Sequence, residues 1–179
     1  GYHMLDTLVA FAPVGDLLTI QPGNVLSLTV EGPECAGVPA DMENLALRGA
    51  ALFAGDTGAA LTLEKWLPAA SGIGGGSSDA AAAMRGILAF LGDDSPHLQS
   101  IATADDDTLA PVAKEILALG ADVPMCMLPR TLRASGIGEK IEFLDLPSLP
   151  AVLVNPRLPV STGAVFSALE ERDNGDLPS

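Results

Sequence analysis

The stretch from Leu67 to Ala82 constrains the fold of this chain more than any other. Gly72, Gly74, Gly75 and Gly76 fall within five positions, and without a Cβ atom their backbone can reach left-handed dihedral angles and approach a bulky anion. Leu61–Trp66 before the glycines has strand character, and Ala80–Leu91 after them carries apolar residues at helical spacing. A glycine-rich turn that leads from a strand into a helix is typical of a phosphate-binding loop, because the helix N-terminus favours anions.

Two better-known nucleotide motifs do not fit the stretch Leu67–Ala82, which we call the cradle. A Walker A loop needs a lysine after its last glycine, and the cradle has none. The dinucleotide fingerprint needs a glycine where Ser77 stands. A flexible Gly/Ser linker is the remaining alternative, but the flanking strand and helix indicate anchored structure. We expect Ser77 or Ser78 to cap the helix.

Composition limits the classes of function. The 179 residues, 48% of them hydrophobic, suffice for the core of one domain with room for part of another. The 9 basic and 23 acidic residues give a net charge of −14, which disfavours nucleic acid and membrane surfaces as partners. Cys35 and Cys126 lie far apart and predict neither a disulfide framework nor a zinc site. No apolar run reaches the roughly 18 residues of a membrane helix, so we expect a cytoplasmic protein.

The pattern of apolar residues predicts a mixture of strands and helices. Besides the strand at 61–66, we expect strands at 5–11, 17–21, 25–31, 131–134, 140–144 and 151–155. We expect one helix over Asp41–Ala54, capped by Asp41 and burying Leu45, Leu52 and Phe53, and another through Val112, Ile116 and Leu119 that starts after Asp105–Asp107 and stops at Gly120. A last helix is expected over Ser161–Glu171, capped by Ser161 or Thr162 and burying Val165, Phe166 and Leu169.

Asp122 lies between Ala121 and Val123, so a carboxylate stands among apolar residues. Burying such a group is costly unless it is hydrogen-bonded or has a function. Aspartate is also common in turns and caps. The residues alone favour the turn or cap.

Five ordered blocks carry a resemblance to a known family. They are Gly1–His3 with Leu5-Asp6, the Pro68–Ala82 cradle, Gly120–Pro124, Gly136–Glu139, and Val154–Pro156 with Pro159–Thr162 and Val165-Phe166. The chain resembles the 4-diphosphocytidyl-2-C-methyl-D-erythritol kinases, a branch of the GHMP small-molecule kinases. The resemblance implies an α+β fold: a GHMP-kinase N-terminal domain of the ribosomal protein S5 domain 2-like type over residues 1–147, with a mixed sheet backed by helices, and the beginning of the C-terminal GHMP domain over 148–179.

The resemblance also implies an activity and a site. The activity is Mg²⁺-dependent transfer of the ATP γ-phosphate to the 2-hydroxyl of 4-diphosphocytidyl-2-C-methyl-D-erythritol, a small-molecule substrate, in the non-mevalonate route to isoprenoids. It makes Asp122 the catalytic base and Lys65 and Asn44 weaker candidates for the adenosine end. The implied ATP-binding residues are Pro68, Ala69, Ala70, Ser71, Gly72, Ile73, Gly74, Gly75, Gly76, Ser77 and Ser78, and the implied substrate-binding residues are Tyr2, His3, Thr162 and Phe166. No metal ligands are assigned.

Other interpretations stay open. Tyr2 and His3 could be a frayed terminus, Phe166 a core residue and Thr162 a helix cap. Another GHMP kinase acting on homoserine or mevalonate would share the cradle, and a non-catalytic ATP-binding fragment is a third reading. Family members begin with a lysine-bearing strand and continue well beyond residue 179. The chain thus resembles a fragment, which we expect to be weakly active or inactive and a monomer or weak homodimer.

Overall fold

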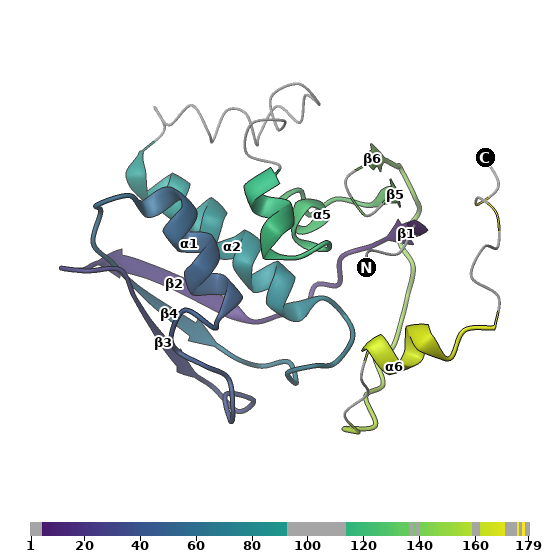
Figure 1. The fold of residues 1–179 in the computed structure, drawn as a ribbon, viewed down its shortest axis with the longest axis horizontal. Coiled ribbons are helices and arrows are strands. Elements are labelled where there is room, and N and C mark those ends of the chain that lie inside the picture. The colour runs from purple at the N-terminus through teal and green to yellow at the C-terminus, as the bar shows by residue number, and fades with distance from the viewer. Residues whose placement is uncertain are drawn as a thin grey trace.

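Helices and strands are mixed along the chain, as expected for an α+β protein (Figure 1). The computed structural model describes residues 5–92, 114–136, 138, 140–158, 162–170, 175 and 177, with Thr162 and Phe166 described by their backbone. The elements are β1 (Leu5–Val9), β2 (Leu17–Pro22), β3 (Ser27–Glu31), α1 (Leu45–Ala54), β4 (Ala59–Glu64), α2 (Gly75–Leu91), α5 (Val123–Met127), β5 (Leu132–Gly136), β6 (Lys140–Phe143) and α6 (Thr162–Ser167). Residues 114–119 are also helical and end at Gly120, as predicted.

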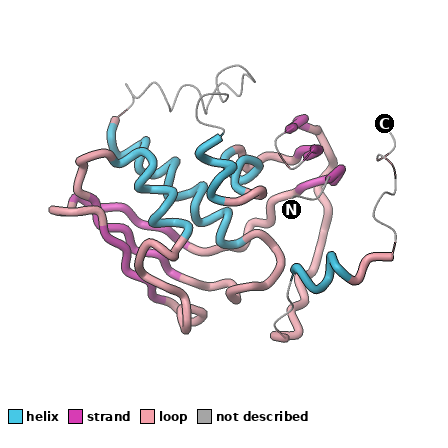
Figure 2. Tube along the Cα trace, viewed as in Figure 1, coloured by secondary structure: helices cyan, strands magenta, loops and turns pink. Residues whose placement is uncertain are grey.

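The described strands form two three-stranded sheets where one mixed sheet was expected. In the order β2-β4-β3, β4 pairs antiparallel with β2 and parallel with β3, so this sheet is mixed. In the order β1-β5-β6, both pairings are antiparallel. Helices α1 and α2 lie together on one face of the mixed sheet, and α5 lies between them and the second sheet (Figures 1 and 2). The cradle therefore leaves the mixed sheet and enters the helical layer.

Small residues bring α1 and α2 into close contact. A Cβ atom at Gly49 of α1 would lie 2.9 Å from the carbonyl oxygen of Ala80 in α2, closer than real Cβ atoms approach, so the crossing requires glycine there. Beneath the helices, Ala59, Leu61 and Leu63 of β4 are buried, and the residues that alternate with them are half-buried. This two-residue alternation is what a sheet covered mainly on one face requires. The packing fixes α2, and with it the end of the cradle.

Helix α1 starts later than predicted. Asn44 is its N-cap, and its Oδ1 accepts the N–H of Ala46 at 2.9 Å. Asp41 instead accepts the N–H of Glu43 in the turn before the helix. The predicted buried position of Leu52 is also wrong, since this side chain is 41% exposed. The buried face consists of Ala46, Leu47, Gly49, Ala50 and Ala54.

The predictions for the C-terminal part are the least accurate. Residues 151–155 form no strand and are exposed, because a strand needs a hydrogen-bonding neighbour and none is described beside them. Helix α6 is shorter than predicted, and Val165 and Leu169 are exposed rather than buried. Asp105–Asp107 lie outside the described residues. The domain boundary at residue 147 stays a prediction.

An ion pair within the second sheet binds the backbone of the C-terminal part of the chain. Arg133 of β5 donates Nε and Nη2 to the two carboxylate oxygens of Asp6 in β1, at 2.7 and 2.6 Å. The backbone N–H of Leu177 donates to Asp6 Oδ2 at 2.6 Å, and the carbonyl of Leu177 accepts from Arg133 at 2.9 Å. The hydrogen bonds from Arg133 and then from Leu177 lower the pKa of Asp6 from 3.8 to about 2.

We predict that Asp6→Asn releases Leu177 from the second sheet. The uncharged amide loses the charge-assisted bonds to Arg133 and Leu177, so hydrogen exchange at the Leu177 amide should become several-fold faster. Because the pKa of Asp6 is lowered in the folded state, the contact is fully present above pH 3.8 and is lost as the pH falls toward 2. Asp145→Asn, at an exposed position, is the control. Equal exchange rates in both variants would contradict the prediction.

Candidate functional site

The cradle presents open backbone N–H groups at the start of α2. Gly72 and Gly74 adopt φ angles of +76° and +75°, and Gly74 is the left-handed N-cap of α2 with no side-chain capping bond. The N–H of Ser78 makes the first helical bond, to the Gly74 carbonyl at 2.9 Å. The preceding N–H groups at the helix start have no capping side chain, and such groups bind anions.

The expected capping role of Ser77 and Ser78 is wrong. Helix α2 begins at Gly75, so both serines lie in its first turn. The left-handed turn at Gly74 starts the helix earlier than a serine cap would. Ile73 is 50% exposed, and Ala69, Ala70, Gly72, Gly76 and Ser78 are also exposed. The cradle is therefore accessible to a ligand.

We predict that Gly74→Ala weakens nucleotide binding roughly tenfold. A Cβ atom at Gly74 would lie 4.0 Å from its nearest neighbour, so the substitution causes no clash. Its effect comes from the left-handed φ, which costs a residue with a Cβ atom about 1–2 kcal/mol and moves the N–H groups. Isothermal titration with ATP measures the change.

The matched control is Gly55→Ala. Gly55 also has a positive φ, +54°, with nothing within 4 Å of an added Cβ atom, but it lies before β4 while the cradle follows β4. This variant should lose stability and keep its affinity for ATP. Equal loss of affinity in both variants would show that strain anywhere in the domain, and not the shape of the cradle, controls binding.

Asp122 lies beside the cradle. Its Oδ2 atom is the one 4.0 Å from the Cβ position at Gly74. Although Asp122 stands at the N-cap position of α5, its side chain makes no capping hydrogen bond, and the residue is exposed. Two residues earlier, a Cβ atom at Gly120 would lie 3.8 Å from Ser77 Oγ. The turn before α5 thus packs against the first turn of α2 and directs the carboxylate to the cradle.

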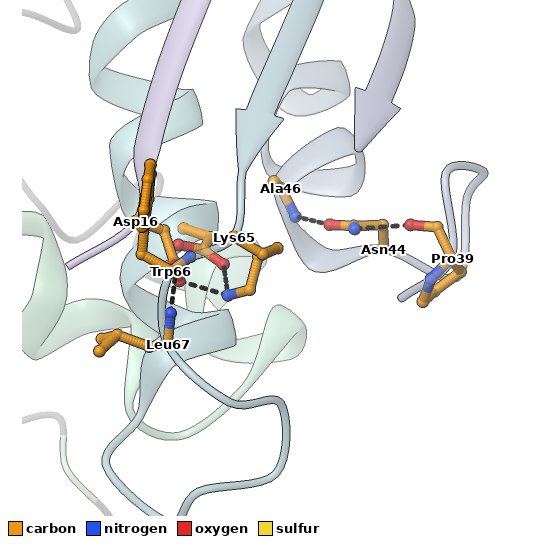
Figure 3. A network of polar contacts seen from close by, with 8 residues as sticks. Asp16, Pro39, Asn44, Ala46, Lys65, Trp66 and Leu67 are labelled. Carbon is orange, nitrogen blue, oxygen red and sulfur yellow. Dashed lines mark hydrogen bonds and ion pairs between the residues drawn. The ribbon is translucent and has the colours of Figure 1, made fainter. Parts of the chain in front are cut away.

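A buried ion-pair network joins the two ends of the cradle (Figure 3). Lys65, just before the cradle, donates Nζ to Asp79 Oδ2 in α2 at 2.9 Å and also pairs with Asp16. Asp16 Oδ1 accepts the N–H groups of Trp66 and Leu67 at 2.6 and 2.9 Å. Lys65 and Asp79 are 5% and 9% exposed. The network holds the strand end and the helix start together.

The pKa directions follow from burial and pairing. Burial raises the pKa of Asp79 above 3.8 despite its bond to Lys65. Burial also acts to raise the pKa of Asp16, but the bonds from Lys65, Leu67 and Trp66 lower it overall. For Lys65, burial acts to lower the pKa, and the bonds to Asp16 and Asp79 raise it above 10.5. Lys65 is therefore held charged.

Sequence reasoning missed Asp16 and Asp79 as a pair of partners for Lys65. The signal available in the sequence was a lysine just before the cradle and an aspartate near its second end. The adenosine candidates Lys65 and Asn44 are both hydrogen-bonded within the chain. Besides capping α1, Asn44 donates Nδ2 to the carbonyl of Pro39 at 2.7 Å (Figure 3).

The remaining predicted site residues are not brought together by described side chains. Tyr2 and His3 lie outside the described residues, and Thr162 and Phe166 are described only by their backbone in α6. The substrate-binding role of these four residues stays a prediction. In the part of the chain that the structure describes, no group of three or more His, Cys, Asp or Glu residues could hold a metal ion. No helix of that part has both the length and the apolar character needed to cross a membrane.

Comparisons with known proteins agree with this geometry. Residues 44–130 match the family model of the GHMP kinases N-terminal domain. The 4-diphosphocytidyl-2-C-methyl-D-erythritol kinase of Roseobacter denitrificans is 49% identical over 99% of this chain, and that of Dinoroseobacter shibae is 48% identical over 100%. In both comparisons, the chain spans 56% of the relative's length.

Solved structures give the same result. The crystal structure of a 4-(cytidine 5'-diphospho)-2C-methyl-D-erythritol kinase matches with a TM-score of 0.74 and 38% identity, over 99% of this chain and 60% of that one. The homoserine kinase of Cytophaga hutchinsonii, at 20% identity and a TM-score of 0.57 over 85% of this chain and 50% of that one, shares the fold. Residues 44–130 therefore carry the GHMP kinases N-terminal domain, within a chain that has the fold of these kinases.

Proposed function

We propose that this chain serves an ATP-dependent kinase that phosphorylates the 2-hydroxyl of 4-diphosphocytidyl-2-C-methyl-D-erythritol. The observation that carries the proposal is the exposed carboxylate of Asp122 next to Gly74 in an uncapped cradle. Curated relatives at 44–49% identity bear the name of this kinase, and they favour this acceptor over that of the fold neighbour at 20% identity.

In the proposed reaction, the N–H groups at the start of α2 and the carboxylate of Asp122 have different roles. The N–H groups at the start of α2 hold the triphosphate, which positions the γ-phosphorus for in-line attack. Asp122 accepts the proton of the acceptor hydroxyl while the oxygen of that hydroxyl forms a bond to the γ-phosphorus. The bond from that phosphorus to the bridging oxygen breaks, and ADP leaves. A neutral hydroxyl is a weak nucleophile near pH 7, so a positioned base is typically worth 10²–10⁴-fold in rate.

The residues at the cradle fit a magnesium ion bound mainly through phosphate. Mg²⁺ commonly keeps several waters and binds substrate phosphates. Ser77 and Ser78 provide hydroxyl groups on the first turn of α2, and the carboxylate of Asp122 stays available to accept the proton. Asp79 is less suited because it is buried against Lys65. When bound, the ion would neutralise charge on the β- and γ-phosphate oxygens.

The proposed partner is a small molecule, with ATP as co-substrate. A net charge of −14 disfavours nucleic acid and membrane surfaces. We propose a cytoplasmic location and a monomeric or weakly dimeric state. Analytical ultracentrifugation across a range of concentrations measures the oligomeric state.

A panel of acceptors tests the proposed activity. The chain is incubated with ATP, Mg²⁺ and either the cytidine-diphosphate acceptor, homoserine or mevalonate, and ³¹P NMR detects the phosphomonoester product. Because the chain is expected to be weakly active at most, we expect slow product formation with the first acceptor and none with the other two. Faster transfer to homoserine or mevalonate would favour another GHMP kinase.

Nucleotide binding is measured separately from turnover. Trp66 is the single tryptophan, is 56% exposed and directly precedes the cradle, so its fluorescence should change when ATP binds. Binding of ATP without transfer to any acceptor would favour a non-catalytic nucleotide-binding role. Absence of binding would contradict the proposed function altogether.

A further inference from the structure

A pocket of about 270 Å³ lies at the first end of the cradle. Its walls come from three segments far apart in sequence: the loop after β3, the cradle residues Pro68–Ala70, and the segment 155–158. The loop contributes Pro33, Glu34 and Ala36, and the segment contributes Asn155, Arg157 and Leu158. The walls are mostly apolar, with charged groups from Glu34 and Arg157.

The two charged groups form an ion pair between two of these walls. Arg157 donates Nη2 to Glu34 Oε1 at 2.7 Å and Nη1 to Oε2 at 3.3 Å, so the guanidinium and the carboxylate meet as two forks. The arginine side chain is 69% exposed and the glutamate side chain 21%. The pair thus lies at the solvent side of the pocket.

The backbone at Arg157 is held in an uncommon conformation that accompanies this pair. Its φ is +58°, a left-handed value that a residue with a Cβ atom rarely adopts. The N–H of Arg157 donates to Asn155 Oδ1 at 2.7 Å, which closes a local turn. Strained dihedral angles persist where the surrounding contacts determine them, and here those contacts are the Asn155 turn and the bond to Glu34.

Apart from the ion pair at Arg157 and the turn at Asn155, segment 151–158 is held by few contacts. It forms no helix or strand, and all of its residues are exposed, with Val152 and Val154 at 86%. The ion pair with Glu34 joins this segment to a residue that is distant in sequence. The shape of the pocket therefore depends on whether the pair is formed.

We propose that Glu34 and Arg157 act as a latch that holds segment 155–158 against the first end of the cradle and so forms one wall of the pocket in which the nucleoside part of the nucleotide lies. This role rests on the proposed function, because Pro68–Ala70 belong to the proposed ATP-binding stretch and also line the pocket. Arg157 and Glu34 are positioning residues. They should affect nucleotide affinity and leave the transfer step to Asp122.

Tryptic cleavage tests the latch without any nucleotide. Glu34→Gln keeps the cleavage site after Arg157 but removes the ion pair, and Glu43→Gln, at an exposed position before α1, is the matched control. We expect cleavage after Arg157 to become roughly two- to fivefold faster in Glu34→Gln, the range for an exposed pair, and to stay unchanged in the control. In the unsubstituted chain, 0.5 M NaCl should accelerate the same cleavage. Equal cleavage in both variants would overturn the latch.

Measurements of nucleotide affinity test whether the ion pair matters for ATP binding. Arg157→Glu places two carboxylates opposite each other and should weaken ATP binding roughly two- to fivefold, with kcat unchanged at saturating ATP. The exchanged pair Glu34→Arg/Arg157→Glu should restore the affinity. Failure of the exchange to restore it, or an unchanged affinity in Arg157→Glu, would overturn the role in binding. If the unsubstituted chain binds no nucleotide, the proposed function fails, and the cleavage comparison still decides whether the latch exists.

Discussion

Replacing Asp122 with asparagine should reduce phosphoryl transfer by about 10²–10⁴-fold and leave ATP affinity within about twofold. Asparagine has nearly the shape of aspartate but cannot accept the hydroxyl proton. Asp122 is exposed and makes no capping bond, so its replacement should leave the fold intact. The effect should thus appear in kcat, because the cradle N–H groups that bind the triphosphate are unchanged.

The measurement compares kcat, the KM for ATP and the thermal midpoint of unfolding in two variants. Asp56→Asn, in the exposed turn after α1, removes the same charge from another surface and should behave as the unsubstituted chain. Transfer at the original rate in Asp122→Asn would show that another group accepts the proton. A matched loss of ATP affinity and of kcat would instead show that the carboxylate acts through the conformation of the cradle, 4.0 Å from the Cβ position of Gly74.

Features decided by neighbouring residues were predictable from the sequence. The cradle depends on glycines between a strand and a helix, and the structure has β4, a left-handed turn at Gly74 and α2 in that order. Predictions of helix starts were wrong where two nearby residues could both cap the helix. Asp41 and Asn44 are both good capping residues, and the structure uses the second because Asp41 closes the preceding turn.

Features decided by tertiary contacts were not predictable in this way. The apolar run at 151–154 has the composition of a strand, but composition cannot supply the neighbouring strand that the hydrogen bonds need. Lys65 and Asp16 are 49 residues apart in sequence. The sequence around either residue does not indicate that the other is buried beside it. The residues alone predicted a turn or a cap at Asp122, and the structure confirms the turn but shows no side-chain capping bond. The functional role of Asp122 beside the cradle followed only from the family resemblance.

Replacing Lys65 with methionine should destabilise the domain by about 3 kcal/mol at pH 7. Removing one partner of a buried ion pair typically costs about 3–5 kcal/mol because a buried charge is left uncompensated. The lower end applies here, since Asp16 keeps the N–H groups of Trp66 and Leu67 as donors. Urea unfolding measures the change, and Lys140→Met, at an exposed position on β6, should change the free energy of unfolding by less than about 0.5 kcal/mol.

Two further measurements separate loss of the ion pair from a general packing defect. In Lys65→Met, burial acts on Asp79 without a compensating ammonium, so the folded state binds a proton more tightly than the unfolded state does. A raised pKa of a carboxyl makes the folded state gain stability as the pH falls, and the variant should therefore recover stability as the pH falls from 7 toward 3.8, the ordinary pKa of this carboxyl. The double variant Lys65→Met/Asp79→Leu should also recover much of the loss, because no carboxylate remains unpaired in α2.

The same variant tests whether the network matters for the ligand as well as for stability. Lys65 lies at the end of the cradle that follows β4, and Asp79 lies on the first turns of α2, so their contact sets the separation of the two ends. In the double variant, stability returns but this contact does not. If the network positions the N–H groups, ATP affinity should stay low in the double variant although the domain is folded. If affinity returns together with stability, packing of α1 and α2 on the mixed sheet is sufficient to shape the cradle.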